Sequence, residues 1–147
     1  MDKLNILIAA SEVVPFAKSG GLADVSGALP KALRDLGHDV RVVMPRYYIV
    51  DKEKYGLKLL KEALGVPMGV MGVAWAGVYV GVLPDSDVPV YFIDHEGFFG
   101  RKGLYDEEGE GYGDNDNRFI FFSKSVMQLA KMLHFKPDVI HVNDWHT

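Results

Sequence analysis

The chain has 147 residues, of which 48% are apolar and 24% charged, and it contains no cysteine. This size and composition are those of one soluble domain with a substantial core. A net charge of −4 without a Lys/Arg cluster argues against nucleic acid or an anionic membrane as partner, and the lack of cysteine excludes disulfides and suits the reducing cytoplasm, where we expect the protein.

The first 45 residues are predicted to form a strand, a helix and a second strand. Residues 4–10 (LNILIAA) are a continuous apolar run, typical of a strand buried on both faces of a parallel sheet. A helix is expected over 22–36, kinked or interrupted at Pro30 and stopped by Gly37, before the strand 39–45 (DVRVVMP). The apolar positions expected to form its buried face are Leu22, Val25, Leu29, Ala32, Leu33 and Leu36. The unit is a right-handed βαβ crossover.

The middle of the chain contains an uncharged stretch, residues 63–83, that is long enough to span a membrane. Its five glycines, one proline and many valines favour buried strands of a β-meander instead. Residues 77–94 read as two strands around a turn at 84–87, whereas 58–62 fits either a strand or a helix.

The last third contains a long polar loop, one helix and one strand. The loop covers 95–117, and loops of this length are usually functional or mobile. A helix should begin near Asn117, capped by Asp114–Asp116, and a strand should cover 139–142. The predicted buried stripe of the helix consists of Phe119, Phe122, Val126, Leu129 and Leu133. No helix follows the last strand, so we expect the chain to be a fragment.

Two polar clusters follow predicted strands. Lys18–Asp24 (KSGGLAD) comes after the first strand and Asn143–His146 (NDWH) after the last. In open α/β sheets, ligands bind at the carboxyl ends of strands. If the two strands are neighbours, both clusters line one crevice; taken singly, each is equally consistent with a turn and a helix cap.

Standard motifs do not identify the ligand. Lys18 precedes Gly20 and Gly21, so the order of a P-loop is absent, as is the GxGxxG dinucleotide fingerprint. A cation beside glycine amides at a helix start would suit a diphosphate or a sugar. A metal site at Asp144 and His146 is conceivable but disfavoured by the ligand rules, and the acidic run 106–111 matches only half a calcium loop.

The clusters do fit a family. The segment ILIAASEVVPFAKSGGLADVSGALPKALRDLGHDVRVVMPRY resembles the N-terminal stretch of bacterial and plant glycogen/starch synthases, the family 5 glycosyltransferases. The resemblance continues through YFIDHEGFFGRKGLY, GYGDNDNRFIFFSKSV and PDVIHVNDWHT, and is weakest over 51–77. One departure is Asn143, which stands where the family usually has a histidine.

This resemblance implies a doubly wound, Rossmann-like α/β domain, the N-terminal half of a two-domain GT-B enzyme whose site lies between the domains. It implies retaining transfer of glucose from ADP-glucose, less often UDP-glucose, to the non-reducing end of an α-1,4-glucan, with no metal or cofactor. The residues that match substrate-binding positions are Lys18 for the donor, Gly20 and Gly21 for its phosphates, and Asp24 and Tyr105 on the sugar side. Asp144 and His146 match the catalytic positions of this half.

Residues 1–147 are therefore expected to be a truncated N-terminal domain, inactive without the C-terminal nucleotide-binding domain. Two alternatives belong to other classes. One is a free-standing sugar- or nucleotide-binding domain without catalysis. The other, a nicotinamide-dependent oxidoreductase, is disfavoured by the missing glycine fingerprint.

Overall fold

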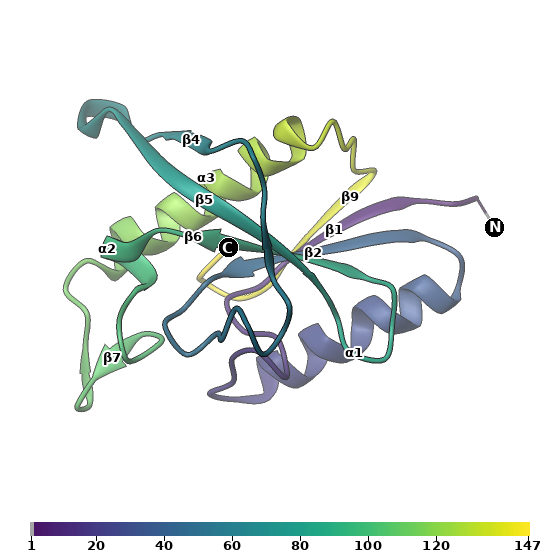
Figure 1. Ribbon diagram of the computed structural model, residues 1–147, viewed down its shortest axis with the longest axis horizontal. Coiled ribbons are helices and arrows are strands. Elements are labelled where there is room, and N and C mark those ends of the chain that lie inside the picture. The colour runs from purple at the N-terminus through teal and green to yellow at the C-terminus, as the bar shows by residue number, and fades with distance from the viewer. Residues whose placement is uncertain (1) are drawn as a thin grey trace.

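The computed structural model describes residues 2–147 and shows one twisted sheet with helices on both faces (Figure 1). The sheet has seven strands in the order β3-β5-β6-β2-β1-β9, with β4 paired to β5. The elements are β1 (Asn5–Ala9), α1 (Gly21–Asp35), β2 (Asp39–Pro45), β3 (Lys58–Leu59), β4 (Leu64–Pro67), the 3-10 turn η1 (Gly69–Met71), β5 (Val73–Val82), β6 (Pro89–Asp94), α2 (Glu96–Phe99), β7 (Asp106–Glu107), β8 (Glu110–Gly111), α3 (Asn115–Met132) and β9 (Val139–Val142).

The centre of the sheet is parallel, as the apolar runs predict. β1 pairs with β2 on one side and with β9 on the other, and β2 pairs with β6. Leu7, Ile8 and Ala9 are almost completely buried because helices cover both faces of these strands. The predicted βαβ unit and the α/β doubly wound class are confirmed.

The helix α1 exists as predicted, but its buried face agrees with the prediction only in part, since Leu29 and Leu33 are partly buried against the core. Small residues and a proline face the sheet: Ala23, Ser26, Gly27 and Pro30. Of the expected stripe, Val25 and Leu36 are more than half exposed. The reason is close approach: a Cβ on Gly27 would lie 2.4 Å from Val14 Cγ2, so only small side chains fit against the loop after β1. Gly37, with φ of 95°, ends the helix region as predicted.

The antiparallel edge of the sheet carries the uncharged stretch 63–83. It forms β4, η1 and most of β5, paired antiparallel as a meander, and in residues 2–147 no helix is long and apolar enough to cross a membrane. The expectation that this stretch is buried holds only in part. Ala76 and Val78 are buried, but Val70 and Trp75 at the projecting end are exposed.

The helix α3 covers the face of the sheet opposite α1 (Figure 1). Its predicted stripe is correct, with Phe119, Phe122, Val126 and Leu129 buried and Leu133 partly buried. It begins at Asn115 rather than Asn117, and the N-cap residue Asp114 makes no capping hydrogen bond, so the predicted side-chain cap is wrong.

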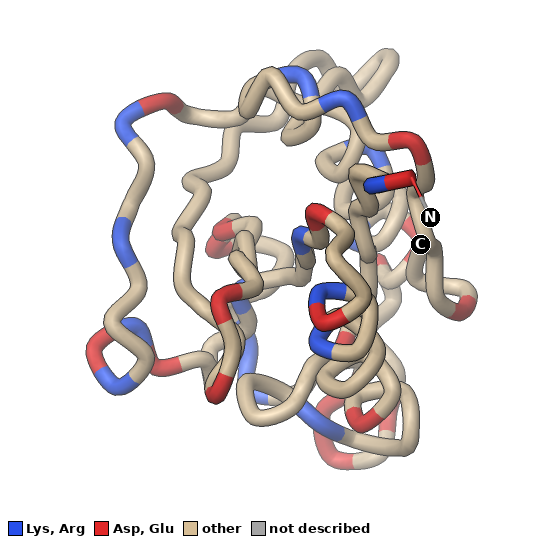
Figure 2. The backbone as a smooth tube through the Cα atoms, turned by 90° about the vertical axis from the view of Figure 1, so that its right-hand side faces the viewer, with Lys and Arg blue, Asp and Glu red and all other residues tan. Residues whose placement is uncertain are grey.

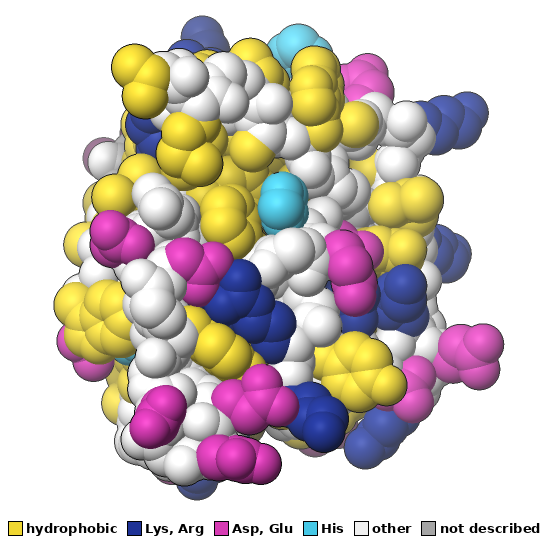
Figure 3. Space-filling view, turned by 90° about the vertical axis from the view of Figure 1, so that its left-hand side faces the viewer, with side chains coloured by type: hydrophobic (Ala, Val, Ile, Leu, Met, Phe, Trp, Pro, Cys, Tyr) yellow, Lys and Arg dark blue, Asp and Glu magenta, His cyan; other side chains and the backbone are white. Residues whose placement is uncertain are grey.

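The segment between β6 and α3, predicted as a long loop, is more ordered than expected. It contains the short helix α2, capped by the His95 ring nitrogen that accepts from the Phe98 amide, and the hairpin β7–β8. The acidic run 106–111 forms this hairpin. Figure 3 shows acidic side chains gathered at the end of the molecule where the hairpin lies, and hydrophobic ones toward the β4–β5 end. Basic and acidic positions are otherwise interspersed along the chain (Figure 2).

Candidate functional site

The two predicted polar clusters lie at one edge of the sheet because β1 and β9 are adjacent and parallel. Ala9 is in register with Val142, so the chain leaves both strands at the same level. The side-chain amide nitrogen of Asn143 donates to the Ala9 carbonyl at 2.9 Å and connects the two strand ends. The two strands are therefore neighbours, which is the condition under which both clusters were expected to line one crevice.

The first cluster is the loop that leads into α1. The Lys18 ammonium lies 2.8 Å from both carboxylate oxygens of Asp24, and both side chains are more than half exposed. Gly20 is the N-cap residue in extended backbone and Gly21 the first residue of the helix. No atom lies within 4 Å of a Cβ built on either glycine, so the space beside them is open.

Glu12 connects this loop to the interior and was not singled out from the sequence. It is 3% exposed. Its carboxylate accepts hydrogen bonds from the Ser19 amide, from Ser19 Oγ at 2.8 Å and from the Gly20 amide at 3.2 Å. Burial alone would raise the pKa of the Glu12 carboxyl, but the hydrogen bonds from Tyr105, Ser19 and Gly20 together hold it below its usual value. A buried anion thus lies directly beneath the glycines.

Tyr105 joins the two clusters. Its hydroxyl lies 2.7 Å from Ser11 Oγ and donates to Glu12 Oε2 at 2.6 Å. Its ring stacks on the His146 imidazole, with centroids 4.6 Å apart and planes at 26°. Burial and the neighbouring Glu12 carboxylate raise the pKa of the Tyr105 phenol, so the hydroxyl keeps its proton and acts as a donor.

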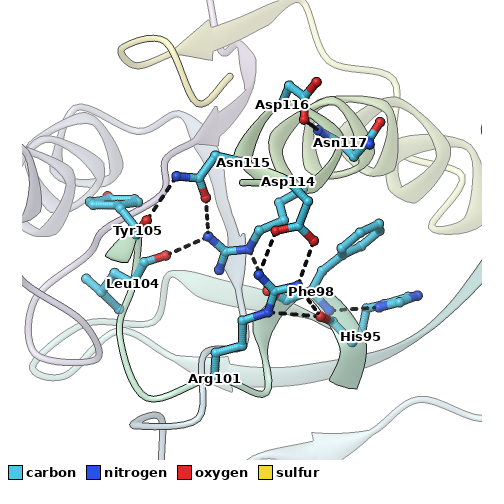
Figure 4. A network of polar contacts seen from close by, with 11 residues as sticks. His95, Phe98, Arg101, Leu104, Tyr105, Asp114, Asn115, Asp116 and Asn117 are labelled. Atoms are coloured by element: carbon cyan, nitrogen blue, oxygen red, sulfur yellow. Dashed lines mark hydrogen bonds and ion pairs between the residues drawn. The ribbon is translucent and has the colours of Figure 1, made fainter. Parts of the chain in front are cut away.

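Arg118 and Asn115 on the first turns of α3 hold the backbone at Leu104 and Tyr105 in place. Figure 4 shows Asn115 beside Tyr105. Arg118 is fully buried, and it donates to the Phe98 carbonyl at 2.7 Å, the Leu104 carbonyl at 3.0 Å and Asn115 Oδ1 at 2.7 Å. The side-chain amide nitrogen of Asn115 in turn donates to the Tyr105 carbonyl at 2.9 Å. Two consecutive carbonyls of the loop are therefore fixed by one helix end.

A second arginine closes the same loop. Arg101 makes a forked contact with Asp114, at 2.7 Å and 2.6 Å, and donates to the Gly97 carbonyl (Figure 4). This explains why Asp114 does not cap α3, since its carboxylate is engaged by Arg101. The bidentate pair lowers the pKa of Asp114 below its usual value, because the guanidinium donates two charge-assisted hydrogen bonds.

The second cluster follows β9. Asp144 has a positive φ of 65°, which aspartate tolerates in single turn residues, and its carboxylate accepts from the Trp145 amide at 2.8 Å. His146 is 4% exposed and its Nδ1 atom has no hydrogen-bond partner among residues 2–147. Burial lowers the pKa of His146 below its ordinary value, although Asp144 and Glu12 act in the opposite direction. A neutral imidazole with a free nitrogen results.

The residues expected at the site thus fall into two groups. Lys18, Gly20, Gly21 and Asp24 are together at the start of α1. Asp144 and His146 follow β9, and Tyr105, from the segment between β6 and α3, stacks on His146. Among residues 2–147, no group of three or more metal-ligating side chains lies close enough to hold an ion. The arrangement offers a cation and helix amides to an anion, and a carboxylate and an imidazole to hydroxyl groups.

Comparison with known proteins agrees with this geometry. Residues 5–147 match the family described as "Starch synthase catalytic domain". The chain belongs to this glycosyltransferase family. Glycogen synthase 1 of Geobacter metallireducens is 62% identical over 147 residues, and Glycogen synthase 1 of Geobacter sulfurreducens is 61% identical. In both cases the alignment covers 100% of this chain and 29% of the relative's length.

A solved structure confirms the fold. The catalytic domain of starch synthase IV from Arabidopsis thaliana, bound to ADP and acarbose, superposes with a TM-score of 0.85 at 32% identity. The match covers 99% of this chain and 29% of that one. The starch-synthase family membership and the GT-B type of fold inferred from the sequence motifs are therefore correct. The chain spans less than a third of the length of these relatives.

Proposed function

We propose that this chain is the N-terminal, acceptor-side part of a glycogen synthase that transfers glucose from ADP-glucose to the non-reducing end of an α-1,4-glucan with retained configuration. The proposal includes a cytoplasmic location, with which the absence of cysteine is compatible. It also includes a second, nucleotide-binding domain outside these 147 residues, without which the chain is inactive.

The observation that carries the proposal is the open space beside Gly20 and Gly21 at the start of a fifteen-residue helix. Neither glycine has a positive φ, and neither is crowded, so the fold of the chain gives no steric reason for glycine at either position. A ligand that approaches the backbone closely would supply that reason. The first amides of a helix lack partners within the helix and favour an anion, and Lys18 adds a positive charge.

A sugar diphosphate fits this environment. As its bond to glucose breaks, negative charge grows on the departing diphosphate, and preorganised amides and a lysine stabilise that charge. This role requires no metal ion and no proton transfer by Lys18. The solved starch synthase IV was bound to ADP, a nucleoside diphosphate, and to acarbose, an oligosaccharide. A protein with this fold therefore binds both kinds of ligand.

The second cluster suits the sugar and the acceptor. The exposed Asp144 carboxylate can accept hydrogen bonds from sugar hydroxyls, and the neutral His146 imidazole has one nitrogen that donates and one that accepts. The Tyr105 ring fixes the imidazole plane. Half of a cleft cannot assemble both substrates, because proximity and charge stabilisation need groups on both sides. Inactivity of the isolated chain follows.

The test is a chimera in which this chain replaces the 147 matching residues of the 62% identical Geobacter metallireducens synthase. The folded chimera should incorporate labelled glucose from ADP-glucose into glycogen at a rate near that of the parent enzyme, and less well from UDP-glucose. The isolated chain should incorporate none. A folded chimera without transfer, or transfer by the isolated chain at similar rates, would contradict the proposal, and a preference for UDP-glucose would contradict the donor assignment.

A further inference from the structure

We infer that Glu12 is a positioning residue, whose buried carboxylate holds the Lys18–Gly21 loop and Tyr105 in one arrangement and thereby decides which loop amides face the ligand. The inference rests on the proposed function for the identity of the ligand. The contacts that carry it belong to the chain itself.

Donors from two distant segments surround the Glu12 carboxylate. The Glu12 carboxylate receives hydrogen bonds from the Ser19 amide, the Ser19 hydroxyl, the Gly20 amide and the Tyr105 hydroxyl. These donors come from two segments more than eighty residues apart in the sequence. A buried carboxylate is tolerated only when donors of this kind surround it, so the charge and the two segments order one another.

Two backbone amides of the Lys18–Gly21 loop point inward to Glu12. Because Ser19 and Gly20 donate inward to Glu12, these two amides do not face a ligand. The N-cap residue Gly20 has no side chain that could cap the helix, so it leaves the first helical amides, which begin at Gly21, without a capping acceptor. An anion is therefore directed to the amides from Gly21 onward. The buried negative charge also disfavours any anion that would sit lower, on Ser19 and Gly20.

Tyr105 connects the Lys18–Gly21 loop to the second cluster. The hydroxyl that donates to Glu12 belongs to Tyr105, and the ring of the same residue stacks on His146. Glu12 thus fixes the donor-side loop relative to the imidazole beyond β9. If this placement matters, loss of the carboxylate should weaken donor binding even when the fold persists.

The structural part of the test uses the chain alone. Glu12→Gln keeps the shape and one acceptor oxygen but removes the charge, and Glu62→Gln, an exposed glutamate, is the matched control. In nitrogen-15 NMR, hydrogen exchange at the Ser19 and Gly20 amides should accelerate at least about tenfold in Glu12→Gln, as expected when a charge-assisted bond is lost. Amides of β2 should keep their protection. Unchanged Ser19 and Gly20 exchange would overturn the inference.

The functional part uses the chimera with ADP-glucose and glycogen varied separately. Glu12→Gln should raise the donor KM about tenfold or more, with the glycogen KM changed less than about threefold. A purely structural role would lower kcat through a smaller active fraction and leave both KM values unchanged, which would overturn the inference. Glu62→Gln should match the unsubstituted chimera in all constants.

Two further variants guard against misfolding of Glu12→Gln. Ser19→Ala removes one donor from an exposed residue, and Tyr105→Phe removes another while it keeps the ring. Each should raise the donor KM severalfold. The double variant Glu12→Gln with Tyr105→Phe should raise the donor KM by less than the product of the two single effects, because both substitutions remove the same Tyr105–Glu12 hydrogen bond. Independent, multiplicative effects would contradict the link. An inactive unsubstituted chimera would contradict the proposed function. The NMR result on the isolated chain does not depend on the activity of the chimera and tests the inference separately.

Discussion

The ammonium of Lys18 lies 2.8 Å from both carboxylate oxygens of Asp24, one turn into the helix that it precedes. The lysine expected to contact the donor is therefore already paired in the free chain. The pair is exposed and weak, since such pairs typically contribute about 0–1 kcal/mol. An anionic ligand can compete with Asp24 for the lysine at small cost.

Replacing Asp24 by asparagine should release Lys18 for the donor. We expect Asp24→Asn to lower the donor KM of the chimera by up to about fivefold, the affinity equivalent of about 1 kcal/mol, and to leave the melting temperature of the chain almost unchanged. Steady-state kinetics and thermal unfolding measure the two effects. A higher donor KM would instead mean that Asp24 orients the lysine in the bound state.

The close contact between α1 and Val14 gives a stability prediction. In Gly27→Ala the new Cβ would meet Val14 Cγ2 at 2.4 Å and the Val14 carbonyl oxygen at 3.1 Å. Overpacking of this kind costs about 1–3 kcal/mol, and the better helix propensity of alanine recovers only part. We expect a net loss of about 1–2 kcal/mol in urea unfolding. Gly21→Ala, which has no atom within 4 Å of the new Cβ, is the control and should be neutral or slightly stabilising.

The buried Arg118 fork gives a second stability prediction. Arg118→Lys keeps the charge but cannot reach the Phe98 carbonyl, the Leu104 carbonyl and Asn115 at once. Losing at least one charge-assisted bond at a fully buried position should destabilise the chain by about 2–4 kcal/mol. The matched variant Lys131→Arg, on the exposed side of α3, should change stability by less than about 0.5 kcal/mol. Equal effects of the two variants would show that the fork contributes nothing special.

Much of the fold was predictable from the spacing of apolar residues along the chain. The strand at 39–45 and the stripe of α3 are correct because apolar residues there face one well-packed surface. The buried face of α1 was predicted only in part, because a helix that approaches a loop closely selects small residues there, and a hydrophobic pattern does not identify small residues. The sequence contained that information only as Gly27 and Pro30 within the helix.

The site was predictable as two clusters but not as one connected unit. Lys18, Asp24 and His146 stand in polar segments that follow apolar strands, and this pattern is visible locally. Glu12 lies in the segment SEVVPF and its partners are a loop seven residues on and a tyrosine ninety-three residues on. The hydrogen bonds from Arg118 to the Leu104 carbonyl and from Asn115 to the Tyr105 carbonyl hold that tyrosine where its hydroxyl reaches Glu12. The one local signal for Glu12 is that a carboxylate stands within a mostly apolar stretch.

The last prediction concerns pH and His146. Burial lowers the folded-state pKa of this imidazole below its ordinary value of 6.5, so the unfolded chain binds the proton more readily than the folded chain. The resulting stability is fully present above pH 6.5 and is lost as the pH falls toward the folded-state pKa. Burial also lowers the pKa of His95, which therefore acts in the same direction.

His146→Phe keeps an aromatic ring against Tyr105 but cannot titrate. Its free energy of unfolding in urea should therefore decline less steeply between pH 7.5 and pH 5 than that of the unsubstituted chain, while carboxylates with lowered pKa values, such as Glu12, act at lower pH. Parallel declines for the two proteins would mean that His146 is protonated as easily in the folded chain as in the unfolded one.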